Sequence, residues 1–146
     1  MPNPGSDPGL TPGVAILVWR AAPELEVLLL HRSRFAPDFE GDWAWMTPGG
    51  RLEAREDAEA AARRELVEET GLVLACTRVA SRVADERRGV DMTAFVAEAP
   101  SSADVRLSAE HDRFEWVRPD ELERCRPPWL ADVYRELLTY RGQTRV

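Results

Sequence analysis

The sequence predicts an α/β fold in which short strands combine with a few helices in one domain. Two apolar runs, Val14–Trp19 and Glu26–His31, are separated by a turn containing Pro23, a pattern typical of adjacent strands. The stretch Asp57–Gly71 is rich in Ala, Glu, Arg and Leu and has no interior Gly or Pro, which predicts a helix. A second helix is predicted over Trp129–Tyr140, where apolar residues recur at helical spacing. A chain of 146 residues can form one domain with a sizeable core.

The remaining elements complete the predicted sheet. Val73–Val83 and Val90–Ala97 are expected to be strands joined by the charged turn Asp85–Gly89. Arg113–Val117 predicts a further strand, and Pro119 is suited to the first turn of a short helix after it. The last helix should then close the other side of the sheet.

The composition and charge of the chain argue against several classes of protein. The net charge of −7 and the pI near 4.9 argue against a binder of nucleic-acid polymers, while small polyphosphates remain possible substrates. Cys76 and Cys125 form no C-x-x-C pair, so we expect neither a disulfide framework nor a metal knuckle, but a protein of the reducing cytoplasm. Residues 1–12 are rich in Pro and Gly and lack signal-peptide features, so we expect a flexible tail before a single domain at 13–146. No apolar run reaches membrane-spanning length, and oligomeric state is not indicated.

Several aromatic and polar residues before the helix allow two interpretations. Arg32–Asp42 is a predicted loop, followed by Trp43 and Trp45, either of which could stack on a nucleobase or pack in the core. Phe95 has the same two alternatives. His31 is interpreted as a polar residue at the end of a strand.

Both ends of the predicted helix carry capping residues. Asp57 is suited to the N-cap, Glu59 places negative charge in the first turn, and Gly71 suits a left-handed C-terminal residue. A narrow apolar face, able to lie close against a sheet, is formed by Ala58, Ala61, Ala62 and Leu66.

The opposite helix face carries the candidate chemistry. Glu65, Glu68 and Glu69 stand at i, i+3 and i+4, where like charges repel and raise each other's pKa. A divalent cation would neutralise them, and all-carboxylate ligands suit Mg²⁺ or Mn²⁺ and not zinc. Arg64 can orient a carboxylate. The alternative is a mixed Glu/Arg face that is simply solvated.

Pro48-Gly49-Gly50 precedes this helix and allows a tight turn with close backbone approach to a ligand. From Gly50 onward, the spacing resembles the Nudix box, G-x5-E-x7-R-E-U-x-E-E-x-G-U, where U is apolar. Every fixed position is filled, namely by Gly50, Glu56, Arg64, Glu65, Leu66, Glu68, Glu69, Gly71 and Leu72.

The resemblance to the Nudix family implies an α/β/α sandwich with a mixed central sheet. It also implies an Mg²⁺-dependent pyrophosphohydrolase, with Mn²⁺ as a possible substitute, that cleaves a nucleoside diphosphate linked to another moiety. The implied metal ligands are Glu65, Glu68, Glu69 and the Gly49 carbonyl.

The same resemblance implies supporting roles. Glu65 is a ligand or the general base, Arg64 orients it, and Glu56 and Gly50 support the site. These roles come from matching positions in the motif and are expectations for this chain.

A second, shorter match lies after the fourth predicted strand. Val105–His111, followed by Trp116, resembles the R-L-S-x-E-H…W segment of asymmetrical diadenosine tetraphosphate hydrolases. It makes Glu110 a candidate ligand or general base, with a surface-loop carboxylate as the alternative and Asp112 as the control. That subfamily usually has Pro-Lys-Gly where this chain has Pro48–Gly50, a form closer to family members that hydrolyse nucleoside triphosphates.

Two other functions are considered. A non-catalytic nucleotide-binding module would be signalled by loss of box carboxylates, and none is lost. An isoprenoid diphosphate isomerase would need a reactive cysteine, whereas Cys76 and Cys125 lie outside the box with nothing nearby to activate them.

Overall fold

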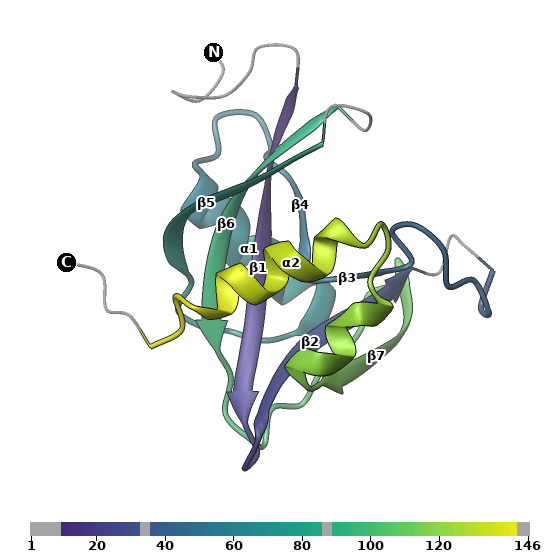
Figure 1. The fold of residues 1–146 in the computed structure, drawn as a ribbon. Helices are drawn as coiled ribbons and strands as arrows, with labels where there is room; N and C mark the ends of the chain where they lie inside the picture. The colour runs from purple at the N-terminus through teal and green to yellow at the C-terminus, as the bar shows by residue number, and fades with distance from the viewer. Residues whose placement is uncertain (1–9, 33–35, 86–88, 143–146) are drawn as a thin grey trace.

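The computed structural model describes residues 10–32, 36–85 and 89–142 (Figure 1). Its elements are β1 (Thr11–Ala21), β2 (Leu25–Arg32), β3 (Trp45–Met46), β4 (Gly49–Arg51), α1 (Ala58–Thr70), β5 (Thr77–Asp85), β6 (Val90–Glu98), β7 (His111–Val117), the 3-10 helix η1 (Pro119–Arg124) and α2 (Trp129–Leu138). β1 thus begins inside the stretch assigned to the tail, and the division into tail and domain stays a prediction. Within the described ranges, no helix is long and apolar enough to cross a lipid bilayer.

The sheet is mixed, as predicted. Its strands run in the order β3-β2-β1-β6-β5, with β4 also paired to β1 and β7 to β2. β1 and β6 are parallel, and the other pairings are antiparallel. β1 is therefore the central strand, and it holds β4, which leads to the helix of the Nudix-like motif.

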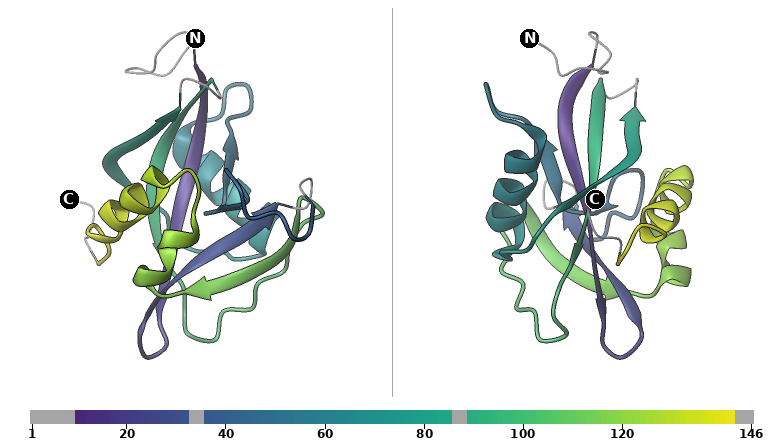
Figure 2. Two further views of the ribbon diagram at one scale, coloured as in Figure 1. Left: turned by 45° about the vertical axis from the view of Figure 1, so that its right-hand side comes forward. Right: turned by 90° about the vertical axis from the view of Figure 1, so that its left-hand side faces the viewer.

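Helices cover both faces of the sheet, which confirms the α/β/α sandwich. Figure 2 shows α1 against one face and α2 with η1 against the other. Side chains alternate along β1, because successive residues of a strand point to opposite faces. Val14, Ile16 and Val18 pack in the cluster under α1, whereas Leu17 packs under α2.

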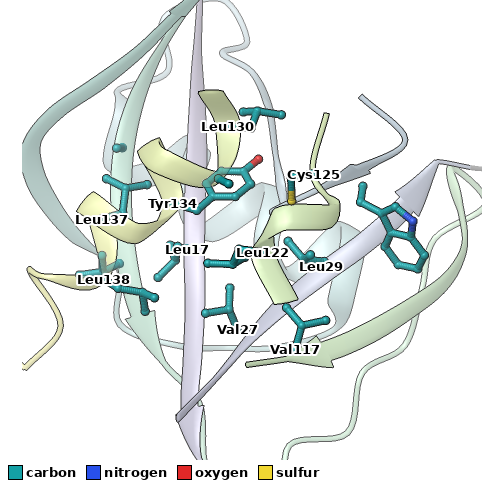
Figure 3. Close-up of a cluster of buried hydrophobic side chains, with 14 of the residues drawn as sticks. Leu17, Val27, Leu29, Val117, Leu122, Cys125, Leu130, Tyr134, Leu137 and Leu138 are labelled. Atoms are coloured by element: carbon teal, nitrogen blue, oxygen red, sulfur yellow. The ribbon is translucent and has the colours of Figure 1, made fainter. Parts of the chain in front are cut away.

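The hydrophobic cluster under α2 contains larger helix side chains than the cluster under α1 (Figure 3). Tyr134, Leu130 and Leu137 of α2 are fully or almost fully buried against Leu17 and other strand residues. The hydroxyl of Tyr134 accepts a hydrogen bond from the Thr47 N–H at 3.3 Å. α2 therefore supports the segment that leads into β4.

Two segments differ from the sequence-based expectation. β5 begins at Thr77 and not at Val73, because the chain must first travel from the end of α1 to the edge of the sheet. Val73 is 84% exposed on this path. Gly49–Arg51 forms a strand paired with β1 and not a tight turn. Residues 86–88 of the predicted turn lie outside the described residues.

Candidate active site

Helix α1 presents the candidate site and has the predicted ends. The Asp57 side chain accepts a hydrogen bond from the Ala60 N–H at 2.7 Å, and Gly71 adopts a left-handed conformation with φ of 73°. Ala61 and Ala62 are completely buried. Because these side chains are small, α1 lies close to β1 and β4, and its carboxylates are held beside the glycine pair.

Arg64 connects several carboxylates on this face. Its Nε and one terminal nitrogen each lie 2.8 Å from an oxygen of Glu56, which makes a bidentate pair. Another terminal nitrogen donates to Glu65 at 3.0 Å and to Glu68 at 3.2 Å. The hydrogen bond from Arg64 lowers the pKa of Glu56 to about 2. Part of the positive charge that the crowded carboxylates require therefore comes from the protein itself.

The glycine pair of β4 is needed by the protein's own packing. A Cβ on Gly50 would lie 2.5 Å from the carboxylate carbon of Glu65, so the missing side chain makes room for that carboxylate. A Cβ on Gly49 would lie 2.3 Å from the Val14 carbonyl oxygen, across the β1–β4 pair. We expected close approach to a ligand, and the structure shows close approach to Glu65 and to β1.

Glu69 lies buried at the base of the site and is 5% exposed. One oxygen accepts a hydrogen bond from the Gly49 N–H at 2.8 Å. Burial raises the pKa of Glu69 to about 8, against the lowering effect of that hydrogen bond, and the charges of Glu65 and Glu110 raise it further. Burial also raises the pKa of Glu65. Ionisation of these two carboxyl groups is therefore disfavoured in the folded protein without a further cation.

The loop before β7 brings Glu110 to the same place. Glu110 interacts electrostatically with both Glu65 and Glu69, although it lies some 40 residues further along the chain. The structure thus brings together helix α1 and the segment singled out by the second sequence match. Asp112, in contrast, hydrogen-bonds to His31 at 2.7 Å, so it is unsuitable as a neutral control for Glu110.

His111 is a site residue that the sequence analysis missed. Its side chain is 7% exposed, and its Nε2 lies 3.8 Å from the Glu69 carboxylate. Burial lowers the pKa of His111. The available signal was its position as the last residue of the R-L-S-x-E-H match, directly after Glu110, but that match was used only to select Glu110.

A pocket opens beside Glu69. It runs from Glu69 and His111, past Met46, to Trp43 and Tyr134. Of the three aromatic candidates, Trp43 lines this pocket, and it also packs against the hydrophobic cluster under α2. The other two aromatic candidates, Trp45 and Phe95, are 2% and 0% exposed and pack in the two cores, as does the fully buried His31 in β2.

The donor atoms fit a hard divalent cation. Glu65, Glu69 and Glu110 offer only carboxylate oxygens, which Mg²⁺ prefers. In the arrangement seen among the described residues, no three His, Cys, Asp or Glu side chains are grouped closely enough to hold a metal. Glu65 and Glu68 instead both contact the guanidinium of Arg64. Glu68 is 55% exposed at its side chain and can rotate.

Neither cysteine is part of this site. Cys76 and Cys125 are free and buried, and burial raises the pKa of each thiol to about 11. Thiols of this kind are poor nucleophiles near neutral pH. The isomerase alternative therefore loses the reactive cysteine that it requires.

Comparisons with known proteins identify the family of this chain. A family profile described as the NUDIX domain matches residues 9–139. A Myxococcus xanthus protein named octanoyltransferase is 42% identical over 129 residues; the match covers 80% of this chain and 33% of that protein, so this chain spans about a third of its length. The RNA pyrophosphohydrolase of Erythrobacter litoralis is 30% identical over 117 residues, covering 65% of this chain and 71% of that protein.

The fold is likewise shared with a solved structure. The crystal structure of a Caenorhabditis elegans Ap4A hydrolase binary complex superposes with a TM-score of 0.73 at 22% identity, covering 88% of this chain and 96% of that chain. At this identity the likeness concerns the fold alone. The family match spans nearly the whole chain and includes the complete box on α1. This chain therefore belongs to the Nudix family.

Proposed function

We propose that this chain is a Nudix hydrolase that uses Mg²⁺, with Mn²⁺ as a substitute, to cleave a nucleoside diphosphate linked to another moiety. The observation that carries the proposal is the buried carboxylate of Glu69, whose pKa is raised to about 8 beside Glu65 and Glu110. A cation would stabilise the ionised form of this group. The adjoining pocket would hold the organic part of a nucleotide.

The metal ligands are proposed to be Glu65, Glu68 and Glu69, with the Gly49 carbonyl as a further ligand. When bound, Mg²⁺ would neutralise phosphate charge and lower the pKa of a coordinated water. Gly49 fixes Glu69 through its N–H, and Arg64 holds Glu65 and Glu68. These contacts position the carboxylates before substrate arrives, and phosphoryl transfer depends chiefly on such positioning.

Glu110 is proposed to accept the proton of the attacking water. It comes from a loop outside the box, it is exposed, and it interacts with both Glu65 and Glu69. A base must lie beside the metal ligands yet remain able to release its proton to solvent, and an exposed loop carboxylate meets both needs. Glu65 is the alternative base, but the donation from Arg64 makes its carboxylate less available.

The pocket suits a flat, apolar group such as a nucleobase. Trp43, Met46 and Met92 offer aromatic and polarisable surface in the lining of the pocket. Ligand pockets commonly combine such apolar walls with a few polar groups. Here the polar end is formed by Glu69 and His111, where the phosphates would lie.

The substrate is proposed to be a dinucleoside polyphosphate of the diadenosine tetraphosphate type or a nucleoside triphosphate. The segment before β7 supports the first, because it supplies Glu110, and Pro48–Gly50 supports the second. An RNA end, the substrate in the name of one relative, is disfavoured by the net charge of −7. A non-catalytic role is disfavoured because every carboxylate of the box is present.

A substrate panel tests the proposal. The purified enzyme with millimolar Mg²⁺ is incubated with nucleoside triphosphates, diadenosine polyphosphates, nucleotide sugars and dinucleotide cofactors, and products are identified by mass. We expect release of a nucleoside mono- or diphosphate from one of the first two classes. Running the reaction in ¹⁸O-water locates the attacked phosphorus, since the label enters the product that carries it.

Two controls accompany the panel. Reactions with EDTA should be inactive, and reactions with Zn²⁺ should be slower than those with Mg²⁺ or Mn²⁺. Turnover of all four classes at equal rates in EDTA would refute the metal-dependent mechanism. Turnover of only the nucleotide sugars would retain the mechanism and reject the proposed substrate.

A further inference from the structure

A buried histidine links three segments at the edge of the site. His31, at the end of β2, is completely buried. Its Nδ1 lies 2.7 Å from a carboxylate oxygen of Asp112, and its Nε2 lies 2.8 Å from the carbonyl oxygen of Phe39. The ring also packs edge-on against Trp45, with centroids 4.9 Å apart. Both nitrogens and one ring edge are thus engaged, which fixes the orientation of the imidazole.

Asp112 occupies an irregular position in the sheet. β2 and β7 pair His31 with Arg113 and Arg32 with His111, so Asp112 is the extra residue of a β-bulge. Bulges bend a strand locally and re-aim the neighbouring side chains, and they are frequent beside active sites. Here the bulge lies directly after Glu110 and His111, the two residues that reach toward Glu69.

We propose that His31 and Asp112 are positioning residues, which pin this bulge and thereby aim Glu110 and His111 at the buried carboxylate of Glu69. The inference rests on the role proposed above for Glu110. Neither residue lines the pocket beside Glu69, so the pair acts through the loop and not on the substrate.

The hydrogen-bond partners of His31 determine which of its atoms donate. Because the Phe39 carbonyl and the ionised Asp112 carboxylate both only accept hydrogen bonds, the two contacts together require a proton on each ring nitrogen of His31. A buried donor that loses its partner is costly, so the bulge is held against the ring. Without Asp112, the bulge keeps its backbone pairing but loses this anchor. Glu110, two residues before Asp112, would then sample several directions.

A double-mutant cycle distinguishes positioning from general stabilisation. Asp112→Ala should lower kcat about 10-fold and leave KM within about 2-fold, while Glu110→Gln should lower kcat about 10²-fold. In the Glu110→Gln background, Asp112→Ala should cost less than about 2-fold, because coupled residues are not additive. Asp112→Asn keeps an acceptor oxygen for His31 and should recover most of the activity.

Amide hydrogen exchange gives a readout that does not depend on turnover. Asp112→Ala should speed exchange at residues 108–112, while Asp104→Asn on the same loop, whose side chain is 77% exposed, should not. Equal kcat losses from Asp112→Ala in both backgrounds, or equal activity of the Ala and Asn variants, would overturn the proposal. An inert Glu110→Gln with intact Mg²⁺-dependent turnover would overturn it together with the proposed base. If no substrate of the panel were turned over, the exchange rates at residues 108–112 would still test whether Asp112 holds the loop.

Discussion

Glu56 and Glu69 are two carboxylates of one motif with opposite electrostatic situations. Their side chains are similarly sheltered, at 13% and 7% exposure. Glu56 is paired with both arms of Arg64, which lowers its pKa to about 2. Glu69 receives one backbone hydrogen bond, and burial raises its pKa to about 8. Glu56 has a bidentate guanidinium partner, whereas Glu69 is buried with a backbone N–H as its hydrogen-bond donor, so the protein neutralises one carboxylate and not the other.

This difference separates the motif into a fixed part and a binding part. The Arg64–Glu56 pair is satisfied within the protein and anchors the start of the motif to α1. Glu69, with Glu65 and Glu110 near it, keeps a cost that a ligand cation can remove. Functional sites commonly hold such destabilising groups because they are needed for binding.

Glu69→Gln should have the largest effect. Glutamine is isosteric and can still accept the Gly49 N–H, but it removes the charge that the metal needs. We expect turnover to fall about 10³-fold or more, since a lost metal ligand should cost more than the 10–100-fold typical of outer-shell partners. The fold should be intact, and without metal the variant should melt higher than wild type near pH 8, because a buried charge is gone.

The measurement is kcat at saturating Mg²⁺ beside a thermal melt. Glu123→Gln is the matched control, because its side chain is 81% exposed, and it should behave as wild type. Wild-type turnover in Glu69→Gln would contradict the assignment of Glu69 to the binding part of the motif.

The adjacent glycines of β4 should separate activity from folding. In Gly50→Ala the new Cβ meets the flexible end of Glu65, which must move, so turnover should fall about 10- to 100-fold with a small change in melting temperature. In Gly49→Ala the Cβ meets the Val14 backbone, which cannot move without breaking the β1–β4 pair. That variant should lose stability first, by roughly 2–3 kcal/mol.

Melting curves and kcat for both alanine variants check this pair. If Gly50→Ala proved as unstable as Gly49→Ala, the Glu65 side chain would be unable to move away from the new Cβ, like the Val14 backbone beside Gly49. The distinction drawn between fixed and adaptable parts of the site would then be wrong at this carboxylate.

Glu56→Gln probes the fixed part of the motif. Loss of the charged bidentate pair should cost about 1–2 kcal/mol at pH 7 and lower turnover about 10-fold, since Arg64 would hold Glu65 and Glu68 less firmly. A carboxylate whose pKa is lowered on folding stabilises the folded state at a pH above its pKa in the unfolded chain. This stabilisation is lost as the pH falls through its pKa in the folded protein. The stability difference between wild type and variant should therefore shrink from about pH 4.5 toward pH 2. A constant difference over that range would refute the pairing.

The sequence predicted the layers of the fold because its local signals agree with the tertiary structure. The caps at Asp57 and Gly71, the alternation in β1 and the helical spacing in α2 each act within a few residues. The start of β5 was misplaced because residues 72–76 are apolar enough for a strand, yet the route of the chain decides where pairing begins.

Long-range contacts account for what the sequence could not predict at the site. The convergence of Glu110 on Glu69 was inferred only through a resemblance, and the roles of His31 and Asp112 depend on the register between β2 and β7. The reason for Gly50 also lies in a distant side chain, that of Glu65. Spacing along one helix is visible in a sequence, whereas contacts between strands, loops and helices are not.

The smallest effect should be the pH dependence of stability that Glu69 confers. A carboxyl group whose pKa is raised from 4.5 to about 8 on folding binds a proton more tightly in the folded state. Its contribution is complete below pH 4.5 and is lost as pH rises toward 8. Without metal, the melting temperature of wild type relative to Glu69→Gln should therefore fall across this range.

Mg²⁺ should reverse this trend, because it binds the ionised carboxylate in the folded state only and stabilises that state by mass action. The rise in melting temperature on adding Mg²⁺ should grow between about pH 5 and pH 8 in wild type and be nearly absent in Glu69→Gln, while Glu56→Gln should still respond. Scanning calorimetry at matched ionic strength measures all three proteins. Equal Mg²⁺ responses in Glu69→Gln and wild type at every pH would mean that the uncompensated carboxylate does not receive the cation, and the contrast between Glu56 and Glu69 would lose its functional meaning.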